Sequence, residues 1–376
     1  MNKILIAAAI GGVLSGSAVA DVNVYGVVDY SAGYFASRVD GGEKSESVQM
    51  DSGRWMGPRV GFKGSEKINE DLTLSFVLET GFDADTGNLG QGGRLFGREA
   101  QMSIKGEFGT VSVGRMGNLA SGNGTFGLTG KEATPFVAAM GIAGHFNYLY
   151  GNNRYDNMLT YRSPTIAGLT FFAQHSLQTN GQETEHVDMN NRYTGLGVTY
   201  RNATTYATFI AEHYRYSNDK QNFDNANTYT LAANHQHGAA KFFATLQYFD
   251  NLPELGMPKA VDEFGRIVSG NKAGDKFVRR NGQGLTGLSG SVSVAYQICG
   301  GTAKASLAYV DVDDDGAEER TEYERTIVGL GYQYPFSKMT GIYVQTNFGM
   351  KTKSVVGKAD VDTKQYQAFA GMYHRF

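Results

Sequence analysis

The sequence predicts an all-β protein, a transmembrane antiparallel up-and-down β-barrel of about sixteen strands. Three observations lead to this prediction. Apolar and polar residues alternate through most of the chain, short and long connections follow one another in turn, and no apolar run after the first twenty residues is long enough for a membrane-spanning helix. Together they are typical of a barrel whose outer face meets lipid and whose inner face meets water.

The alternation is clear at both ends of the predicted barrel. In the stretch VNVYGVVDYSAGYF, Val22, Val24 and Tyr30 fall on one face, while Asn23 and Asp29 fall on the other. Similar segments recur as far as QAFAGMYHRF at the C-terminus. Because successive side chains of a strand point to opposite faces, this period indicates strands with one apolar and one polar face. We expect the last strand to pair with the first and close the sheet.

The connections between the predicted strands differ in length in a regular order. Short turns such as GEFG, HGAA and CGGT alternate with longer polar stretches. Short turns on one rim and long extracellular loops on the other are typical of outer-membrane barrels, whereas sandwiches and propellers do not separate their loops in this way. The long stretches are residues 36–53, 83–96, 116–152, 179–191, 216–226, 251–288, 311–321 and 351–361.

The amino terminus predicts a secretory signal peptide over residues 1–20. Lys3 gives a positive start, residues 4–13 form an apolar core, and Ala18-Val19-Ala20 is a small-residue cleavage site before Asp21. The remaining residues, 21–376, show no composition break and predict a single barrel domain.

The overall composition excludes several classes of function. The chain carries 34 Lys and Arg against 37 Asp and Glu, a formal charge of -3, which argues against nucleic-acid binding. Cys299 is the single cysteine, so no disulfide can form within the chain. No arrangement of His with Ser or Asp predicts catalysis, and we expect no enzymatic activity.

The quoted segments resemble the Gram-negative general porins, and most closely their betaproteobacterial and neisserial branch. The matching stretches include PRVGFKGSEKINEDLTLSFVLETGF, LFGREAQMSIKGEFGTVSVGR, NRYDNMLTYRSPTIAGLTF and the terminal GMYHRF. The resemblance implies a homotrimer in the outer membrane, surrounded by lipid and lipopolysaccharide, that passes small hydrophilic solutes and ions by passive diffusion. It also implies that the outer-membrane assembly machinery reads the terminal Phe376, which we expect to point outward at the short-turn rim.

The resemblance further implies a pore constriction. The third long loop, residues 116–153, would fold into the lumen and narrow it. Arg59, Arg98 and Arg154 fall at positions that resemble the basic wall cluster of the family, Glu79 stands at its acidic partner, and Glu132 is nearly the only acid of the loop. Alternation turns Arg59 and Arg154 inward but puts Arg98 on the lipid side, so Arg98 needs a bulge or a place near the rim. The balance predicts a weak preference for anions.

Two alternatives remain open. A substrate-specific channel for an oligosaccharide or an organic acid would show an inward row of aromatic residues, and Tyr148, Tyr150 and Tyr155 are candidates for it. An outer-membrane barrel enzyme is the other, although such barrels use fewer strands and catalytic groups on the rim.

One acidic stretch satisfies a calcium-loop pattern. Asp311, Asp313, Asp315 and Glu322 occupy the ligand positions of D-x-D-x-D-G-x5-E, with Gly316 at the turn. Predicted strands rather than helices flank the stretch, so a solvated acidic loop is the competing interpretation. No other cofactor is expected.

Overall fold

The structure is a computed structural model that describes residues 21–136, 141–151, 153–217, 224–253, 283–317 and 319–376. The signal peptide predicted at residues 1–20 lies outside these ranges, and so does most of the long stretch 251–288. Within the described ranges, no helix has the length and apolar character needed to cross a bilayer.

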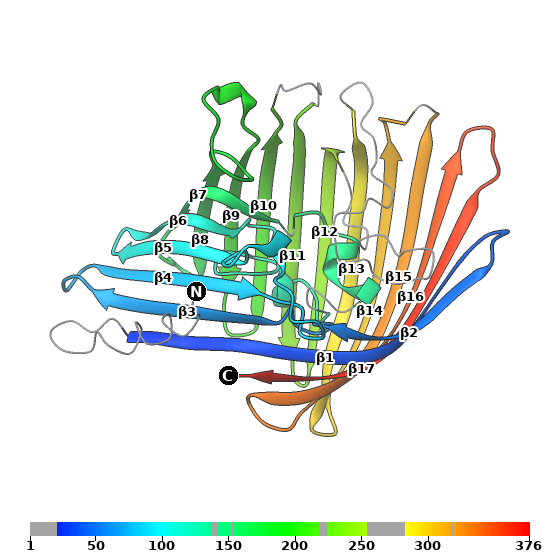
Figure 1. Ribbon diagram of the computed structural model, residues 1–376, viewed down its shortest axis with the longest axis horizontal. Helices are drawn as coiled ribbons and strands as arrows, with labels where there is room; N and C mark the ends of the chain where they lie inside the picture. Colours follow the sequence, from blue (N-terminus) through cyan, green and yellow to red (C-terminus); the bar gives the residue numbers. More distant parts are fainter. Residues whose placement is uncertain (1–20, 137–140, 152, 218–223, 254–282, 318) are drawn as a thin grey trace, which may run out of the picture.

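Seventeen strands and five short 3-10 helices make up the described chain (Figure 1). The helices are η1 (Gln91–Gly93), η2 (Gly130–Glu132), η3 (Gly141–Ala143), η4 (His145–Asn147) and η5 (Val187–Met189). The strands are β1 (Asp21–Val39), β2 (Lys44–Ser52), β3 (Arg59–Lys67), β4 (Thr73–Gly81), β5 (Glu99–Gly106), β6 (Gly109–Gly117), β7 (Arg154–Arg162), β8 (Leu169–Ser176), β9 (Arg192–Arg201), β10 (Thr205–Arg215), β11 (Ala226–His237), β12 (Ala240–Leu252), β13 (Leu285–Ile298), β14 (Gly301–Asp314), β15 (Thr321–Pro335), β16 (Thr340–Val355) and β17 (Val361–Arg375).

The sheet closes on itself, as the sequence predicts. From β3 onward each strand pairs antiparallel with the next strand in the chain, and β1 pairs with β17 in a register that sets Ala32 opposite Ala370. On its other edge, β1 pairs with β3 through its first half and with β2 through its second half. Strands β2 and β3 therefore share one position, and the seventeen strands form a barrel of sixteen. Closure leaves no free strand edge in the bilayer.

The C-terminal residue is bound to β1 where the barrel closes. The backbone of Phe376 exchanges two hydrogen bonds with Gly26, of 3.0 and 3.2 Å. The ring of Phe376 lies against Gly26, in space that a Cβ atom would occupy, and is 49% exposed on the outer side. Because Gly26 has no side chain, the Phe376 ring can pack directly against β1 at this position.

Part of the predicted first loop is wrong. Residues 36–53 were expected to form a loop, yet β1 continues to Val39 and β2 begins at Lys44. The polar stretch KSESVQMDS has only two apolar residues, Val48 and Met50, so its alternation is too weak to predict a strand, and pairing with β1 together with contacts of Tyr34 to Lys44 and Glu46 holds it in place. Strand β14 likewise continues to Asp314 and β16 to Val355.

The break between β2 and β3 is held by a buried carboxylate. Asp29, which is fully buried on the inner side of β1, accepts hydrogen bonds from the backbone N–H groups of Trp55 (2.8 Å) and Met56 (2.7 Å). The Tyr343 hydroxyl donates a third, of 2.7 Å. This fixes the course of the chain into β3, where Arg59 is the first residue.

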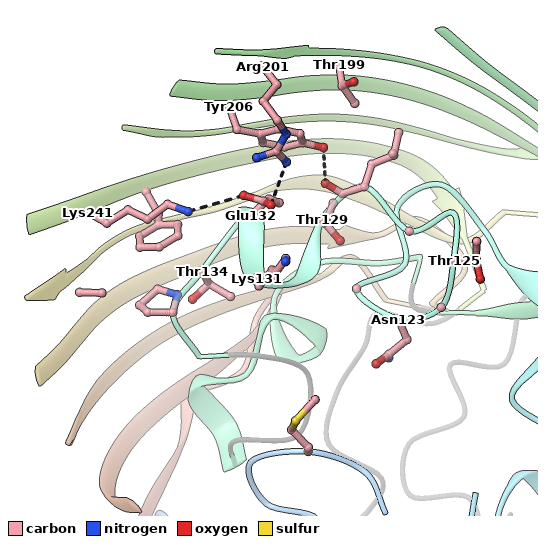
Figure 2. Close-up of a pocket in the computed structure, with 18 of the residues that line it drawn as sticks. Asn123, Thr125, Thr129, Lys131, Glu132, Thr134, Thr199, Arg201, Tyr206 and Lys241 are labelled. Atoms are coloured by element: carbon pink, nitrogen blue, oxygen red, sulfur yellow. Dashed lines mark hydrogen bonds and ion pairs between the residues drawn. The ribbon is translucent and has the colours of Figure 1, made fainter. Parts of the chain in front are cut away.

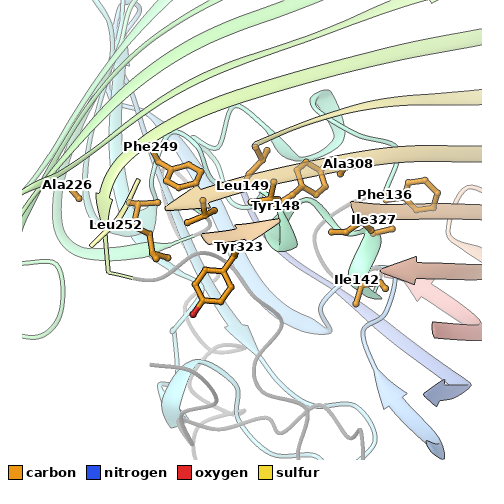
Figure 3. Close-up of a cluster of buried hydrophobic side chains, with 14 of the residues drawn as sticks. Phe136, Ile142, Tyr148, Leu149, Ala226, Phe249, Leu252, Ala308, Tyr323 and Ile327 are labelled. Atoms are coloured by element: carbon orange, nitrogen blue, oxygen red, sulfur yellow. The ribbon is translucent and has the colours of Figure 1, made fainter. Parts of the chain in front are cut away.

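The two faces of the wall differ as alternation predicts. Apolar side chains such as Leu196, Phe209 and Leu231 are half exposed on the outside, while the buried inner positions carry many Ser, Thr, Asn and Gln residues. The packed core lies inside the barrel, between its wall and the third long loop (Figure 3). Its members include Phe136, Ile142, Tyr148 and Leu149 from the loop and Phe249, Leu252, Tyr323 and Ile327 from the wall.

Candidate functional site

The third long connection, between β6 and β7, crosses the interior of the barrel. Gln247 of β12 holds it at two points, since its Nε2 donates to the Tyr150 carbonyl (2.9 Å) and its Oε1 accepts from the Tyr150 N–H (2.7 Å). On the opposite wall, the Ile142 N–H donates to Gln367 Oε1 of β17 (2.9 Å). The loop is therefore tied to strands on both sides of the lumen, as expected for an element that narrows the channel.

A buried glutamate anchors the start of this loop. Glu212 lies on the inner face of β10, 3% exposed, and both its oxygens accept hydrogen bonds. The donors are Asn118 Nδ2 (2.8 Å), the Ala120 N–H (3.1 Å), Tyr193 OH (2.7 Å), Tyr214 OH (2.8 Å) and Thr228 Oγ1 (3.1 Å). Sequence reasoning missed Glu212, although a single acid on the inward face of TTYATFIAEHYRY was the available signal.

Two of the predicted arginines meet the predicted acid. Arg98 Nε donates to Glu79 Oε1 at 2.5 Å, and Arg59 Nη1 lies 3.8 Å from the same oxygen. Tyr25 OH donates to the other oxygen, Glu79 Oε2, at 2.9 Å. Arg98 and Glu79 are both only 6% exposed. The structure thus brings Arg59, Arg98 and Glu79 together on one side of the lumen.

Arg98 does not face lipid. It precedes β5, whose first residue is Glu99, so strand alternation does not yet govern its direction. Arg154 starts β7 on the same side of the lumen, and its Nε and Nη2 atoms are shielded from solvent. Neither nitrogen has a hydrogen-bond partner among the described residues.

Glu132 is the last residue of η2 in the third long loop and lies away from this cluster, against strands β9 and β12. Figure 2 shows its carboxylate between Arg201 Nη2, at 2.8 Å, and Lys241 Nζ, at 3.6 Å. Asn234 Nδ2 donates to it as well, at 2.9 Å. Burial raises the pKa of Glu132, but the hydrogen bonds from Arg201 and Asn234 and the two positive charges outweigh burial and hold this pKa below its ordinary value. Glu132 therefore fastens the loop to the wall.

A basic cavity of about 890 Å³ lies between the loop and the short-turn end of the barrel. Arg162 and Arg201 are the last residues of strands that lead into short turns, Arg375 is the last residue of β17, and all described lining residues except Glu132 are basic or uncharged. The lining cations are Arg59, Lys131, Arg162, Arg201, Lys241, Lys304 and Arg375. We call this set the basic vestibule.

Aromatic rings support four of the vestibule cations. Each charged group lies over a ring of the wall, which orients the side chain without neutralising its charge. The pairs are Arg162 with Phe172 (5.9 Å to the ring centre), Arg201 with Tyr206 (4.4 Å), Lys241 with Phe243 (5.1 Å) and Arg375 with Trp55 (5.0 Å). Sequence reasoning missed this set. The available sequence signal was an inward-facing cation near the short-turn end of a strand. Such cations are Arg162, Arg201, Lys241, Lys304 and Arg375.

The tyrosines considered for an aromatic row pack together instead. Tyr148 is buried and accepts a hydrogen bond from Ser291 Oγ at 3.2 Å. Tyr150 and Tyr155 both contact the ring of Tyr214, with ring centres 5.4 and 6.3 Å apart. These rings join the loop to the wall and do not form a continuous row along the channel.

The four predicted calcium ligands do not converge. Asp311 and Asp313 project from the exposed face of β14, Asp315 follows the strand, and Glu322 lies on β15 opposite Asp313. Arg320 contacts both Asp313 (4.0 Å) and Glu322 (2.9 Å). Among the residues that the structure describes, no three His, Cys, Asp or Glu side chains are grouped to hold a metal ion. The extended course of β14 explains the difference, because it spaces Asp311 and Asp313 along a strand, whereas a calcium loop must wrap its ligands round one ion.

Comparisons with known proteins agree with this architecture. The chain matches the model of the Gram-negative porin family over residues 5–354. It is 28% identical to an outer membrane porin protein of Bordetella pertussis and 22% identical to the major outer membrane protein P.IB of Neisseria meningitidis serogroup B, with 100% of each chain covered in both cases.

Two solved structures have the same fold. An anion-selective porin from Comamonas acidovorans superposes with a TM-score of 0.66 at 20% identity, covering 95% of this chain and 100% of that one. OmpF of Salmonella typhi, in complex with daunomycin, gives 0.59 at 17% identity, covering 96% and 100%. The predicted barrel is confirmed, and so is the predicted family resemblance.

Proposed function

We propose that this chain, which belongs to the Gram-negative porin family and is an integral outer-membrane channel, passes small hydrophilic solutes by diffusion and prefers anions to cations. The basic vestibule carries the anion preference in this proposal. Seven cations and one acid line a single aqueous space, and Glu132 is itself engaged by Arg201 and Lys241. A cavity with one sign of charge and low-dielectric walls concentrates ions of the opposite sign.

The constriction cluster contributes in a different way. Glu79 contacts Arg98 and Arg59 together, so most of the positive charge there is balanced over a short distance. Arg154 adds a further cation nearby, without an ion pair to a described acid. This arrangement supports a local field across the channel, while the larger excess charge belongs to the vestibule.

Further parts of the proposal concern assembly. We include removal of residues 1–20, insertion by the outer-membrane machinery through Phe376, contact with outer-membrane lipid and lipopolysaccharide, and a homotrimer. Support for the trimer is that a related barrel of known structure, OmpT of Vibrio cholerae, is described in a trimer form. Family membership favours a channel over an enzyme, and the packed tyrosines give no support to a dedicated aromatic sugar path.

Planar-bilayer recording of the purified protein tests the proposal. In a potassium chloride gradient we expect stepwise conductance and a reversal potential of the sign set by chloride. A reversal potential of the opposite sign would overturn the anion preference while leaving the channel. An absence of conductance steps from correctly folded protein would overturn the diffusion function itself.

A further inference from the structure

A small cavity lies at the end of the barrel that carries the long connections. Its volume is about 170 Å³. The end of the third long loop, the connection 179–191, the starts of β7 and β9 and the end of β10 line it. It shares no lining residue with the basic vestibule, which lies toward the short turns. The two cavities are therefore separate places at which a solute can be held.

Four tyrosine side chains form the aromatic part of this cavity. They are Tyr150 of the loop, Tyr155 of β7, Tyr214 of β10 and Tyr216, which directly follows that strand. The Tyr214 ring stands edge-on to Tyr150 and Tyr155, with ring planes at 80° and 68°. Its hydroxyl donates to the buried Glu212 at 2.8 Å, which fixes the ring. Rings held in this way give a rigid surface against which a further ring can pack.

Two arginines form the charged part of the cavity. Arg192 of β9 and Arg215 of β10 stand directly opposite each other in the strand register, and both line the cavity. Like charges in this position destabilise a sheet. Arg192 Nε is shielded from solvent and has no hydrogen-bond partner among the described residues, and no described aspartate or glutamate lines the cavity. The pair therefore presents donors and positive charge that an anion would satisfy.

Size and chemistry together select the ligand. An apolar cavity of about 150 Å³ holds one benzene molecule, so this cavity has room for a single six-membered ring. Guanidinium groups form charge-assisted, often bidentate hydrogen bonds with carboxylates. An inorganic anion would not use the aromatic surface, and a neutral sugar would leave the arginine charges opposed. A single aromatic ring that carries a carboxylate uses both parts of the cavity.

We propose that the four tyrosines, with Arg192 and Arg215, form a binding site for a small aromatic carboxylate such as benzoate. The carboxylate lies between the two guanidinium groups, and the ring packs against the tyrosines. This inference rests on the proposed channel, because it gives one class of solute an added site at the long-loop entrance. Such a site must release its ligand to the lumen, so we expect a dissociation constant on the order of 1 mM.

A second pair of opposed cations at the same end of the barrel provides a matched control. Arg38 of β1 stands opposite Lys44 of β2 in the strand register. Lys44 already contacts an acid, since its Nζ is 2.6 Å from Glu46 Oε2. Neither Arg38 nor Lys44 lines the tyrosine cavity. Replacing this pair removes two cations from the same rim and leaves the proposed site intact.

The test measures binding of para-fluorobenzoate to the full mature protein in detergent by fluorine NMR. The variants are Arg192→Gln with Arg215→Gln, the charge-keeping Arg192→Lys with Arg215→Lys, and Tyr216→Leu. Arg38→Gln with Lys44→Gln is the control. The probe para-fluorobenzyl alcohol has the ring without the charge, and trifluoroacetate has the charge without the ring. A heat-modifiable gel shift confirms that each barrel is folded.

We expect the glutamine pair to lower the affinity for para-fluorobenzoate by about tenfold, since two charge-assisted contacts are lost. The lysine pair should recover part of that loss, and Tyr216→Leu should lower the affinity by about threefold through loss of one ring contact. The control pair should bind the probe as the wild type does. The alcohol and trifluoroacetate should each bind about tenfold more weakly than para-fluorobenzoate, because each uses only one part of the cavity.

Equal affinity of the wild type and the glutamine pair would overturn the proposal, as would equal affinity for para-fluorobenzoate and either of the other two probes. An equal loss in the control pair would also overturn it, because the effect would then come from rim charge in general. Binding in detergent does not require conduction, so planar-bilayer recording separates the two proposals. Protein that conducts but does not bind the probe contradicts the aromatic site alone, whereas protein that binds the probe but does not conduct contradicts the channel function.

Discussion

The constriction cluster and the basic vestibule both carry arginines, yet they handle charge in different ways. Arg98 and Glu79 are almost fully buried and form a direct ion pair, with Arg59 close by. In the vestibule, Arg162 and Arg201 are exposed and rest on aromatic rings, and the single acid, Glu132, is shared between Arg201 and Lys241. A buried cation needs a nearby acid because its desolvation is unfavourable, whereas a hydrated cation does not. The excess positive charge therefore remains where the lumen is wide.

This difference means that the arginines easiest to recognise need not dominate selectivity. Motif position identifies the buried cluster, where opposite charges lie within a few ångströms. The seven vestibule cations lie on seven separate elements of the chain and come together only through closure of the barrel. Their combined charge acts on ions before the narrow part of the channel is reached.

The largest effect on anion preference is expected when positive charge is removed from the vestibule. Replacing five wall cations by Gln should lower the chloride-to-potassium permeability ratio by on the order of tenfold, because a cleft of one charge raises local counterion concentration by at least that factor. The positions are Arg162, Arg201, Lys241, Lys304 and Arg375. Reversal potential measures the effect, and Arg192→Gln with Arg215→Gln is the control, since neither residue lines the vestibule. An unchanged ratio in the five-site variant would refute the assignment.

A smaller effect is expected from the constriction. Arg59→Gln with Arg154→Gln should lower the permeability ratio by roughly twofold to threefold, because Glu79 then loses one counter-charge while Arg98 remains. Repeating the measurement at high salt sharpens the contrast. Screening weakens the influence of exposed vestibule charges more than that of buried ones. A larger change here than in the five-site variant would reverse the ranking.

Glu132→Gln should act in the opposite direction. It removes the one acid of the vestibule lining and the ion pairs with Arg201 and Lys241, so the anion preference should rise by less than about twofold and current noise from the loop should increase. Asn234→Ala is a matched control, because it removes a neutral donor to the same carboxylate and leaves the charge. Wild-type current noise and a wild-type chloride-to-potassium permeability ratio in Glu132→Gln would contradict both expectations.

The same ion pairs predict a dependence on pH. The pKa of Glu132 lies below its ordinary value of 4.5, so the contact stabilises the loop above that value and is lost as the pH falls through the lowered pKa. Wild-type channels recorded at about pH 3 should approach the noise of Glu132→Gln at neutral pH. Noise in Glu132→Gln itself should change less over the same range.

The smallest effect on conduction is expected at the chain ends. Deletion of Phe376 should reduce the amount of assembled barrel, while channels that do assemble should conduct normally. Gly26→Leu should reproduce the assembly defect, because its side chain would occupy the place of the Phe376 ring. Val22→Ala, on the exposed outer face of the same strand, is the control. The folded fraction is read from a heat-modifiable gel shift, and normal assembly without Phe376 would exclude the proposed role.

Much of the fold could be predicted from the sequence because alternation is a local property. Strands such as β10 and β17 show it directly, and closure follows from the need to pair every edge. Residues 44–52 escaped prediction because their alternation is too weak, with only Val48 and Met50 apolar. The glycine-rich connection could be placed in the lumen only through the family resemblance.

The site was less predictable because its contacts join distant segments. Glu79 and Arg98 are separated by a loop whose course alternation does not describe, so alternation alone could not show how Arg98 reaches the lumen. Glu132 contacts Arg201 and Lys241 only because the loop crosses the barrel interior. The sequence marks Glu212 as a lone inward-facing acid, but it does not identify the loop groups that donate to it. The calcium pattern matches in residue spacing alone, because its first two ligand positions, Asp311 and Asp313, lie on the extended strand β14.

The junction of β1 with β17 has a consequence for how the chain can be written. Phe376 is hydrogen-bonded to Gly26, and the order of strands round the cylinder is cyclic. The first and last strands of the barrel therefore meet at one junction of a cyclic order, and the barrel does not require the break between them to lie at this place. A circular permutant with Phe376 linked to Asp21 and opened between Cys299 and Gly300 keeps every strand neighbour. In such a molecule Phe376 still packs against Gly26 but no longer ends the chain. The permutant therefore separates the packing role of this residue from its role as the C-terminal residue.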